Sequence, residues 1–311
     1  MRAVVTGATG FVGRLLLGKL PSSVVLSRDP GRTAGRLQEF PTRLVAWEPA
    51  QEPAPAAALE DADAVFHLAG EPIAEGRWTA AKKRRLWDSR VEGTRQLIAG
   101  LERVRPRPRV LVCASAIGYY GDRGDRELRE TDSPGEGFLA ELCVAWERAA
   151  VAAETLGMRV VRLRIGLVLG TSGGLLARLV PLFRLGLGSP LGRGDQWMSW
   201  IAVDDLVALL LASAEQETYS GPVNATGPQP VTNRQFTATL AGVLGRPAWL
   251  PAVPTWALRI AVGEFASGLV ASHRVVPARA LEEGFVFQHP SLQDTLQHLL
   301  GPGQTKPDVE P

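Results

Sequence analysis

Residues 3–13 read Ala-Val-Val-Thr-Gly-Ala-Thr-Gly-Phe-Val-Gly, a short apolar run that leads into a turn with a glycine at every third position. The run predicts a β-strand, and the apolar residues that recur at helical spacing after it predict a helix. Such a strand-turn-helix unit places backbone N–H groups against a pyrophosphate at the start of the helix. In this pattern Gly7 permits the sharp turn, Gly10 leaves room for the phosphates, and Gly13 lets the helix pack on the sheet. We therefore expect a dinucleotide site rather than a purely structural turn, with contacts from Gly7, Thr9, Gly10, Phe11, Val12 and Gly13.

The rest of the chain alternates strand-like and helical stretches. Apolar runs that predict strands lie at 3–5, 24–26, 64–68, 110–113 and 160–164. Continuous apolar strands that alternate with helices predict an α/β protein with a doubly wound parallel sheet, whose ligands bind at the carboxyl ends of the strands. We expect a Rossmann domain over residues 1–170, with a strand and a helix returning to it near 199–228. A smaller, mostly helical substrate lobe is expected over 171–300, and a disordered polar tail over 301–311.

Composition and charge narrow the class of protein. The chain has 311 residues, of which 45% are hydrophobic and 21% charged, as in ordinary globular proteins. A net charge of +2 does not favour nucleic-acid binding, and we interpret the basic clusters at 82–85 and 103–109 as solvated surface. No apolar run is long enough for a membrane span, and the chain enters the glycine turn without a secretory signal. The expected partner is a small-molecule substrate, with no nucleic acid and no membrane.

The cysteines and histidines carry weaker signals. Cys113 falls in an expected strand and Cys143 in an expected helix, and they form no C-x-x-C pair, which predicts reduced thiols in a cytoplasmic protein. No metal site is expected, because no metal-ligand spacing links the four histidines, which are His67, His273, His289 and His298.

The end of the second strand bears on the choice of cofactor. An acidic residue at this position of a Rossmann sheet bonds the adenosine ribose hydroxyls and favours NAD. Here the strand is followed by Ser27 and Arg28, and a hydroxyl beside a guanidinium suits a ribose 2′-phosphate. Asp29 keeps NAD open as an alternative, and a plain loop charge is the alternative role of Arg28. The residues favour NADP.

Several stretches together resemble a known family. The chain is similar to extended short-chain dehydrogenases/reductases, and more narrowly to the atypical subgroup named for nucleoside-diphosphate-sugar epimerases, whose C-terminal epimerase-like segment has no known function. The resemblance covers residues 1 to about 300. The stretches that carry it are 5–13, 67–73, 77–78, 88–90, 115–121, 138–143, 183–188, 196–201 and 221–226.

The resemblance implies roles for residues beyond the glycine turn. Leu68, Ala69 and Gly70 would pass beside the cofactor ribose, where small residues allow a close backbone approach. Arg90 would face the cofactor or the substrate, with a surface salt bridge as its alternative role. Arg164 would lie near the nicotinamide. The resemblance also leaves a homodimer open.

The chain departs from the family at the catalytic pair. Members with the usual chemistry carry Tyr-x-x-x-Lys, in which the tyrosine is the acid/base and the lysine lowers its pKa. The corresponding positions hold Leu139 and Cys143, and neither side chain can do that work. The third catalytic position falls on Ser115 or, with a different anchor, on Ala116, and we favour Ser115.

Other side chains are candidates for the missing chemistry. Tyr120 and Glu141 are expected as catalytic groups, with packing and surface exposure as their respective alternatives. Two hypotheses stay open: an NADP-dependent oxidoreductase or epimerase that acts on a hydroxylated or nucleotide-sugar substrate, and a non-catalytic NADP(H)-binding sensor. Aromatic contacts to a substrate, with core packing as the alternative for the last two residues, are expected from Tyr119, Trp78, Trp197 and Trp200.

Overall fold

A seven-stranded parallel sheet forms the centre of the computed structural model, which describes residues 1–301. Its strand order is β3-β2-β1-β4-β5-β7-β11, and every neighbouring pair is parallel. The order reverses beside β1, so a crevice is expected at the carboxyl ends of β1 and β4. The doubly wound α/β sheet predicted from the sequence is confirmed. The strands are β1 (Ala3–Thr6), β2 (Ser23–Ser27), β3 (Thr42–Ala46), β4 (Ala64–His67), β5 (Val110–Ala116), β7 (Arg159–Ile165) and β11 (Gly221–Ala225).

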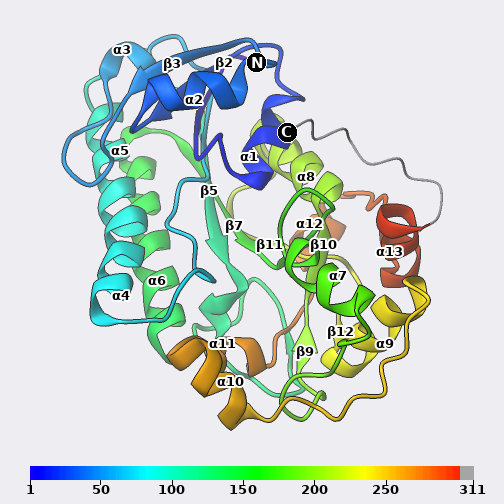
Figure 1. The fold of residues 1–311 in the computed structure, drawn as a ribbon. Helices are drawn as coiled ribbons and strands as arrows, with labels where there is room; N and C mark the ends of the chain where they lie inside the picture. The colour runs from blue at the N-terminus through cyan, green and yellow to red at the C-terminus, as the bar shows by residue number, and fades with distance from the viewer. Residues whose placement is uncertain (302–311) are drawn as a thin grey trace.

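Helices cover both faces of this sheet because alternate residues of each strand point to opposite sides. Ala3 and Val5 of β1 belong to one apolar cluster, and Val4 between them belongs to another. The first face packs on α1 (Phe11–Leu17), α2 (Pro30–Leu37), α8 (Val203–Glu215) and α12 (Ala278–Glu282). The second packs on α3 (Ala56–Leu59), α4 (Ala80–Trp87), η1 (Asp88–Glu92), α5 (Gly93–Leu101) and α6 (Phe138–Val151). Figure 1 shows α1 and α8 on one side of the central strands and α4, α5 and α6 on the other.

The C-terminal half of the chain returns to the sheet before it builds a smaller region. The return consists of β10 (Trp200–Ala202), α8 and β11, of which β11 is the edge strand beside β7. Three further two-stranded pairs lie within residues 1–301, and the last of them joins the two halves of the chain: β8 (Leu167–Leu169) with β10, β9 (Trp197–Met198) with β12 (Val231–Thr232), and β6 (Glu127–Leu128) with β13 (Arg274–Val275).

The remaining helices are short and lie mostly in this smaller region, toward the lower part of Figure 1. They are η2 (Ile117–Tyr120), η3 (Ala152–Leu156), α7 (Leu176–Arg184), α9 (Asn233–Val243), α10 (Thr255–Val262), η4 (Gly263–Phe265), α11 (Ala266–Val270) and α13 (Leu292–Leu300). A third apolar cluster joins α7, α9 and α13 through Phe183, Phe236, Leu240 and Leu296.

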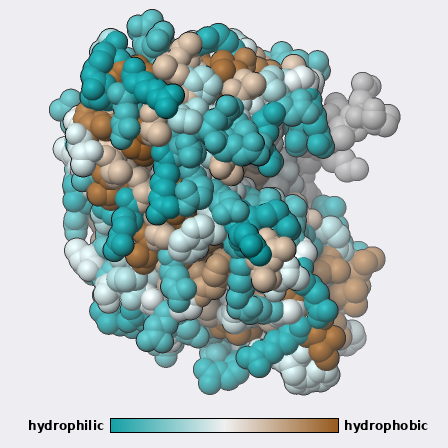
Figure 2. All heavy atoms as spheres, turned by 90° about the vertical axis from the view of Figure 1, so that its left-hand side faces the viewer, coloured by the Kyte–Doolittle hydropathy of each residue, from teal (hydrophilic) through white to brown (hydrophobic). Residues whose placement is uncertain are grey.

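The surface is that of a mixed polar protein. Figure 2 shows a face dominated by hydrophilic residues, with hydrophobic residues in small groups. Across residues 1–301, none of the helices combines the length and the apolar character needed to span a bilayer. The predicted tail lies, from residue 302 onward, outside the described residues.

Candidate functional site

The glycine turn brings the ends of β1 and β4 into close contact. Gly7 has a φ of +72°, and a Cβ built on it would lie 2.6 Å from the carbonyl carbon of Leu68. A Cβ on Gly13 would collide with the Gly7 carbonyl oxygen, so Gly13 lets α1 approach the turn. Gly10 is the N-cap residue of α1, and its N–H donates to the Gly7 carbonyl at 3.0 Å. The three glycines therefore have distinct physical roles: a left-handed turn, an uncovered helix start and close helix packing.

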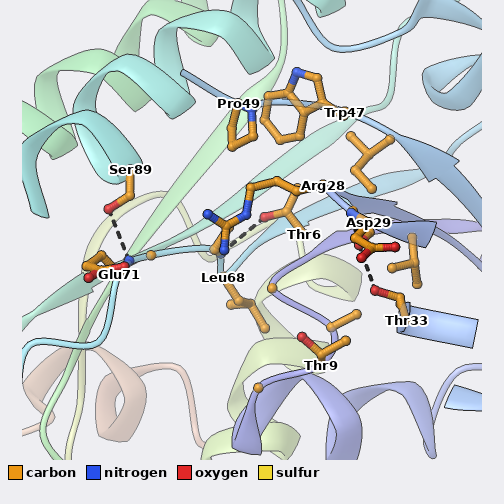
Figure 3. Close-up of a pocket in the computed structure, with 18 of the residues that line it drawn as sticks. Thr6, Thr9, Arg28, Asp29, Thr33, Trp47, Pro49, Leu68, Glu71 and Ser89 are labelled. Atoms are coloured by element: carbon orange, nitrogen blue, oxygen red, sulfur yellow. Dashed lines mark hydrogen bonds between the residues drawn. The ribbon is translucent and has the colours of Figure 1, made fainter. Parts of the chain in front are cut away.

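A cavity of about 860 Å³ opens at the carboxyl ends of β1, β2 and β4. Figure 3 shows the labelled side chains around it, with Thr9 at the start of α1, Leu68 after β4 and Arg28 after β2. Val12 and Gly13 do not line it, and Val12 packs against the core instead. Nine of the thirteen predicted cofactor residues line the cavity, because the turns after β1, β2 and β4 converge here, and Arg90 and Arg164 do not line it. The predicted residues that line the cavity are Gly7, Thr9, Gly10, Phe11, Ser27, Arg28, Leu68, Ala69 and Gly70.

The β2 end of the cavity is strongly cationic. Arg28, Arg32 and Arg36 all line it. Asp29 is committed elsewhere, since its carboxylate accepts the Arg32 backbone N–H at 2.9 Å and caps α2. Ser27 Oγ lies 2.7 Å from Thr33 Oγ1, and Figure 3 shows Thr33 beside the Asp29 end of this wall. Guanidinium groups with a capping aspartate suit a phosphate better than a ribose diol.

Two of these arginines are missing from the predicted set. Arg32 and Arg36 follow Arg28 at intervals of four residues, and residues four apart share a face of a helix. That spacing was the signal that could have found them. Trp47 and Pro49 also line the cavity after β3, and no motif in the sequence marks them.

A buried hydrogen-bond chain holds the turn after β4. Ala69 N–H donates to Thr6 Oγ1 at 3.1 Å, which lies 2.8 Å from His67 Nδ1. His67 Nε2 lies 3.0 Å from Thr94 Oγ1, and Thr94 donates to the Arg90 carbonyl. Every group in this chain is satisfied when His67 is neutral with its proton on Nε2, a tautomer assigned from the partners. Burial, with the charge of Arg90, lowers the pKa of His67 to about 4, which keeps it neutral.

Arg90 is buried beside the cavity wall. Only 8% of the residue is exposed, and its guanidinium lies 3.0 Å from where a Cβ on Gly70 would stand. It donates to the Glu71 carbonyl at 3.0 Å and lies over the Trp146 ring at 5.2 Å. No ion pair among residues 1–301 includes it, so the alternative of a surface salt bridge is wrong. Burial lowers the pKa of Arg90, the usual effect of desolvation on a cation.

The predicted catalytic serine lies in a second, enclosed polar network. Ser115 is 3% exposed, and its Oγ donates to Glu147 Oε1 at 2.8 Å. Glu147, itself buried on α6, accepts Arg164 Nε at 2.8 Å and a second Arg164 nitrogen at 3.0 Å. Burial disfavours the charge of Arg164, but the hydrogen bonds and charge of Glu147 raise its pKa above the ordinary value. Ser115 and Arg164 therefore meet at a carboxylate that the sequence analysis did not single out.

Tyr120 closes the same network from the other side. It is fully buried, accepts from Arg164 at 2.9 Å and donates to Asn224 Oδ1 at 2.6 Å. Burial raises the pKa of Tyr120 to about 12. Ser115, Tyr120, Glu147 and Arg164 are all absent from the lining of the cavity. Their polar atoms satisfy one another, an arrangement typical of a structural network.

Tyr119, a predicted substrate contact, and Glu141, a predicted catalytic group, do not share the hydrogen bonds of this network. Tyr119 is half-buried, and the Arg164 guanidinium stands 3.4 Å from its ring centre. Glu141 is exposed in the first turn of α6. Within residues 1–301, neither the Tyr119 hydroxyl nor the Glu141 carboxylate has a hydrogen-bond partner. Cys143, at the position of the family's lysine, is buried, and its burial raises its pKa to about 12.

The three tryptophans occupy separate places. Trp200 is fully buried in the third apolar cluster and donates to the Gln229 carbonyl, so its interpretation as a substrate contact is wrong. Trp78 is 8% exposed and packs against Phe138 and Phe265. Trp197 is half-buried, and its indole donates to Asp125 at 2.9 Å.

The parallel sheet, with a dinucleotide-sized cavity where the strand order reverses, defines the class of dinucleotide-binding Rossmann proteins. The chain matches the NAD dependent epimerase/dehydratase family over residues 3–225 and a domain of unknown function over residues 253–299. It therefore belongs to the NAD dependent epimerase/dehydratase family, and the resemblance found in the sequence is confirmed.

Individual relatives extend the match over almost the whole chain. The epimerase family protein Mb2239 of Mycobacterium bovis is 41% identical, over 97% of this chain and 97% of its own. The crystal structure of human epimerase family protein SDR39U1 with NADPH has a TM-score of 0.85 at 30% identity, covering 96% of this chain and 99% of that one. A nucleoside-diphosphate sugar epimerase structure from Corynebacterium glutamicum has a TM-score of 0.77 at 31% identity, covering 97% and 58%.

Proposed function

We propose that this protein binds NADP(H) in the cavity at the ends of β1, β2 and β4. The observation that carries the proposal is the convergence of Arg28, Arg32 and Arg36 on the wall where a Rossmann protein holds the adenosine ribose. One guanidinium group can donate two parallel hydrogen bonds to the oxygen atoms of a 2′-phosphate. The human relative crystallised with NADPH supports the same choice of dinucleotide.

The rest of the cavity fits such a ligand. The start of α1 is uncovered at Gly10, where backbone N–H groups can face a pyrophosphate. Gly70 lets the Arg90 guanidinium approach the segment after β4, since a Cβ on Gly70 would stand 3.0 Å from it. We assign Arg90 to the cofactor as well, because a buried guanidinium without a carboxylate partner in the described chain is best satisfied by an anionic or hydroxylated ligand.

We further propose an oxidoreductase or epimerase that acts on a small hydroxylated molecule or a nucleotide-sugar. The cofactor supplies hydride transfer at its nicotinamide when bound. Among the predicted groups, Tyr119 and Glu141 are the two whose oxygen atoms are uncommitted within the described residues, so we assign proton transfer to one of them rather than to Tyr120. The nucleotide-sugar class follows the Corynebacterium glutamicum relative. The buried free thiols Cys113 and Cys143 support a cytoplasmic location.

A specific observation favours the second candidate, a non-catalytic NADP(H)-binding protein. Ser115, at the family's third catalytic position, and Tyr120, the predicted replacement for the catalytic tyrosine, are hydrogen-bonded to Glu147, Arg164 and Asn224. A protein that only senses the cofactor would keep the cavity and lose the acid/base pair.

The first experiment measures binding, through the fluorescence of NADPH and NADH titrated with the protein. The proposal expects NADPH to bind at least about tenfold more tightly, since charge-assisted hydrogen bonds to a 2′-phosphate contribute roughly 1.5–3 kcal/mol. Equal affinities would overturn it.

A second experiment separates the two candidate functions. NADPH consumption is followed with a panel of carbonyl compounds and nucleotide-sugars, for the natural chain and for Tyr119→Phe and Glu141→Gln. Turnover that falls in one variant supports an enzyme. Tight NADPH binding with no turnover across the panel supports the sensor.

A further inference from the structure

Two histidines far apart in the sequence meet on the surface of the smaller region, away from the cofactor cavity. The ring centroids of His289 and His298 lie 5.0 Å apart, with their planes at 30°. His289 Nε2 is 4.0 Å from the Asp204 carboxylate. One ligand atom from each of these three residues lies within 4.8 Å of the other two. No motif links them in the sequence, because they come from α8, from the segment before α13, and from the last turn of α13.

We propose that Asp204, His289 and His298 form a binding site for a divalent transition-metal ion such as Zn²⁺. Two imidazoles and one carboxylate are the ligands that zinc accepts, and imidazole excludes a site built for Mg²⁺ or Ca²⁺. Three protein ligands leave a fourth position of a tetrahedral ion for water.

The separations suit one ion between the three side chains. With Zn–N bonds of about 2.0–2.1 Å, two imidazoles on one tetrahedral zinc ion have ring centroids roughly 5 Å apart, close to the separation seen here. The same bonds place ligand atoms roughly 3.3 Å apart, so separations that lie within 4.8 Å must close by at most about 1.5 Å. Side-chain rotation suffices, because Asp204 and His298 are exposed and free to turn.

The backbone around the site is fixed in advance. Asp205, 1% exposed, accepts the backbone N–H groups of Gln288 at 2.8 Å and His289 at 3.0 Å. This carboxylate joins the start of α8 to the segment that carries His289. The helix that carries His298 is held by Leu292 and Leu296, which are buried in the third apolar cluster. A bound ion would add a direct bond between α8 and α13.

Metal binding is tested on the full chain without a polyhistidine tag, after chelator treatment. Zn²⁺ is titrated by calorimetry, and Co²⁺ is used as a spectroscopic probe through its visible absorption. We expect one bound ion per chain, a higher melting temperature with Zn²⁺, and at least a tenfold loss of affinity in His289→Gln and in His298→Gln.

Substitutions on the helix that carries His298 provide the controls. Gln297→Ala and Asp294→Asn lie on α13 but outside the cluster, and both should leave Zn²⁺ affinity unchanged. Each histidine variant should retain the NADPH affinity of the natural chain, which shows that it is folded. The proposal is overturned if the natural chain binds no Zn²⁺, or if both histidine variants bind it as tightly as the natural chain.

Discussion

The cofactor cavity and the network around Arg164 are both rich in polar side chains, but these side chains have opposite surroundings. In the cavity, Arg28, Arg32 and Arg36 face open space. In the network, Arg164 donates from all three of its nitrogens to Glu147, Tyr120 and the Glu130 carbonyl. Polar groups that face an open cavity can bind a ligand, whereas polar groups that hydrogen-bond to one another in the interior stabilise the fold. The sequence pointed to both regions as parts of one active site. The contacts show that the cavity is a binding surface and that the network around Arg164 is an internal brace.

The largest expected effect comes from breaking the brace. Glu147→Gln removes the charge that offsets buried Arg164, and leaving a buried charge unpaired costs about 3–5 kcal/mol of unfolding free energy. Glu141→Gln is the matched control on the same helix, since this carboxylate is exposed, and should change stability by less than about 0.5 kcal/mol. Urea unfolding of both variants measures the difference. Equal stabilities would show that the network does not brace the fold.

Buried His67, beneath the cavity, makes the stability of the fold depend on pH. Burial lowers the pKa of His67 to about 4 from the ordinary 6.5, and that of His273 likewise. Between pH 6.5 and 4 the unfolded chain binds these protons and the folded chain does not, so stability falls as the pH falls. The loss reaches at most about 3 kcal/mol for each histidine and levels off below pH 4.

The histidine prediction is measured as a difference between two chains. Unfolding free energies of the natural chain and of His67→Gln are compared at pH 7 and at pH 4.5, so that all other titrating groups cancel. The natural chain should lose more stability than the variant. An identical loss in both would mean that His67 is not held neutral.

The cavity itself is tested by removing one guanidinium. Arg28→Ala should weaken NADPH binding roughly 10- to 100-fold, because a charged hydrogen-bond partner contributes about 1.5–3 kcal/mol. Arg84→Ala removes an exposed arginine that does not line the cavity, and should leave the affinity unchanged. Fluorescence titration measures both, and an unaltered affinity in Arg28→Ala would remove the main support for the 2′-phosphate contact.

The smallest expected effect is at the tyrosine pair. Tyr120→Phe deprives Asn224 and Arg164 of a hydroxyl partner and should cost about 1–2 kcal/mol of stability, with NADPH affinity unchanged. Tyr119→Phe, whose hydroxyl has no partner within residues 1–301, should be nearly neutral for stability. Should Tyr120→Phe abolish turnover while stability is preserved, Tyr120 would be a catalytic residue and the brace interpretation would fail.

Local patterns allowed much of the cofactor site to be predicted. The spacing of Gly7, Gly10 and Gly13 is a backbone requirement, so it is visible in the sequence and has the same meaning in the structure. Ser27 and Arg28 could be predicted to line the cavity because Ser27 ends β2 and Arg28 directly follows it.

The remaining site residues depend on long-range packing. In the sequence, nothing distinguishes Glu147 from the other polar residues of its helix. Its role depends on Ser115 of β5 and Arg164 of β7, which contact it only in the folded protein. His289 and His298 meet only because α13 docks beside α8 and α9. The sheet was predictable because a few consecutive residues indicate each strand and helix. Contacts between residues 17 or more positions apart, such as Glu147 and Arg164, leave no local pattern in the sequence.

A double-mutant cycle shows whether the arginines at the end of β2 hold a 2′-phosphate. The affinities of NADPH and NADH are measured for the natural chain and for Arg28→Ala, so that one change removes the phosphate from the ligand and the other removes the guanidinium from the protein. We expect a coupling free energy of about 1.5–3 kcal/mol between the two changes. A coupling near zero, with Arg28→Ala weakening both dinucleotides equally, would mean that Arg28 does not contact the 2′-phosphate.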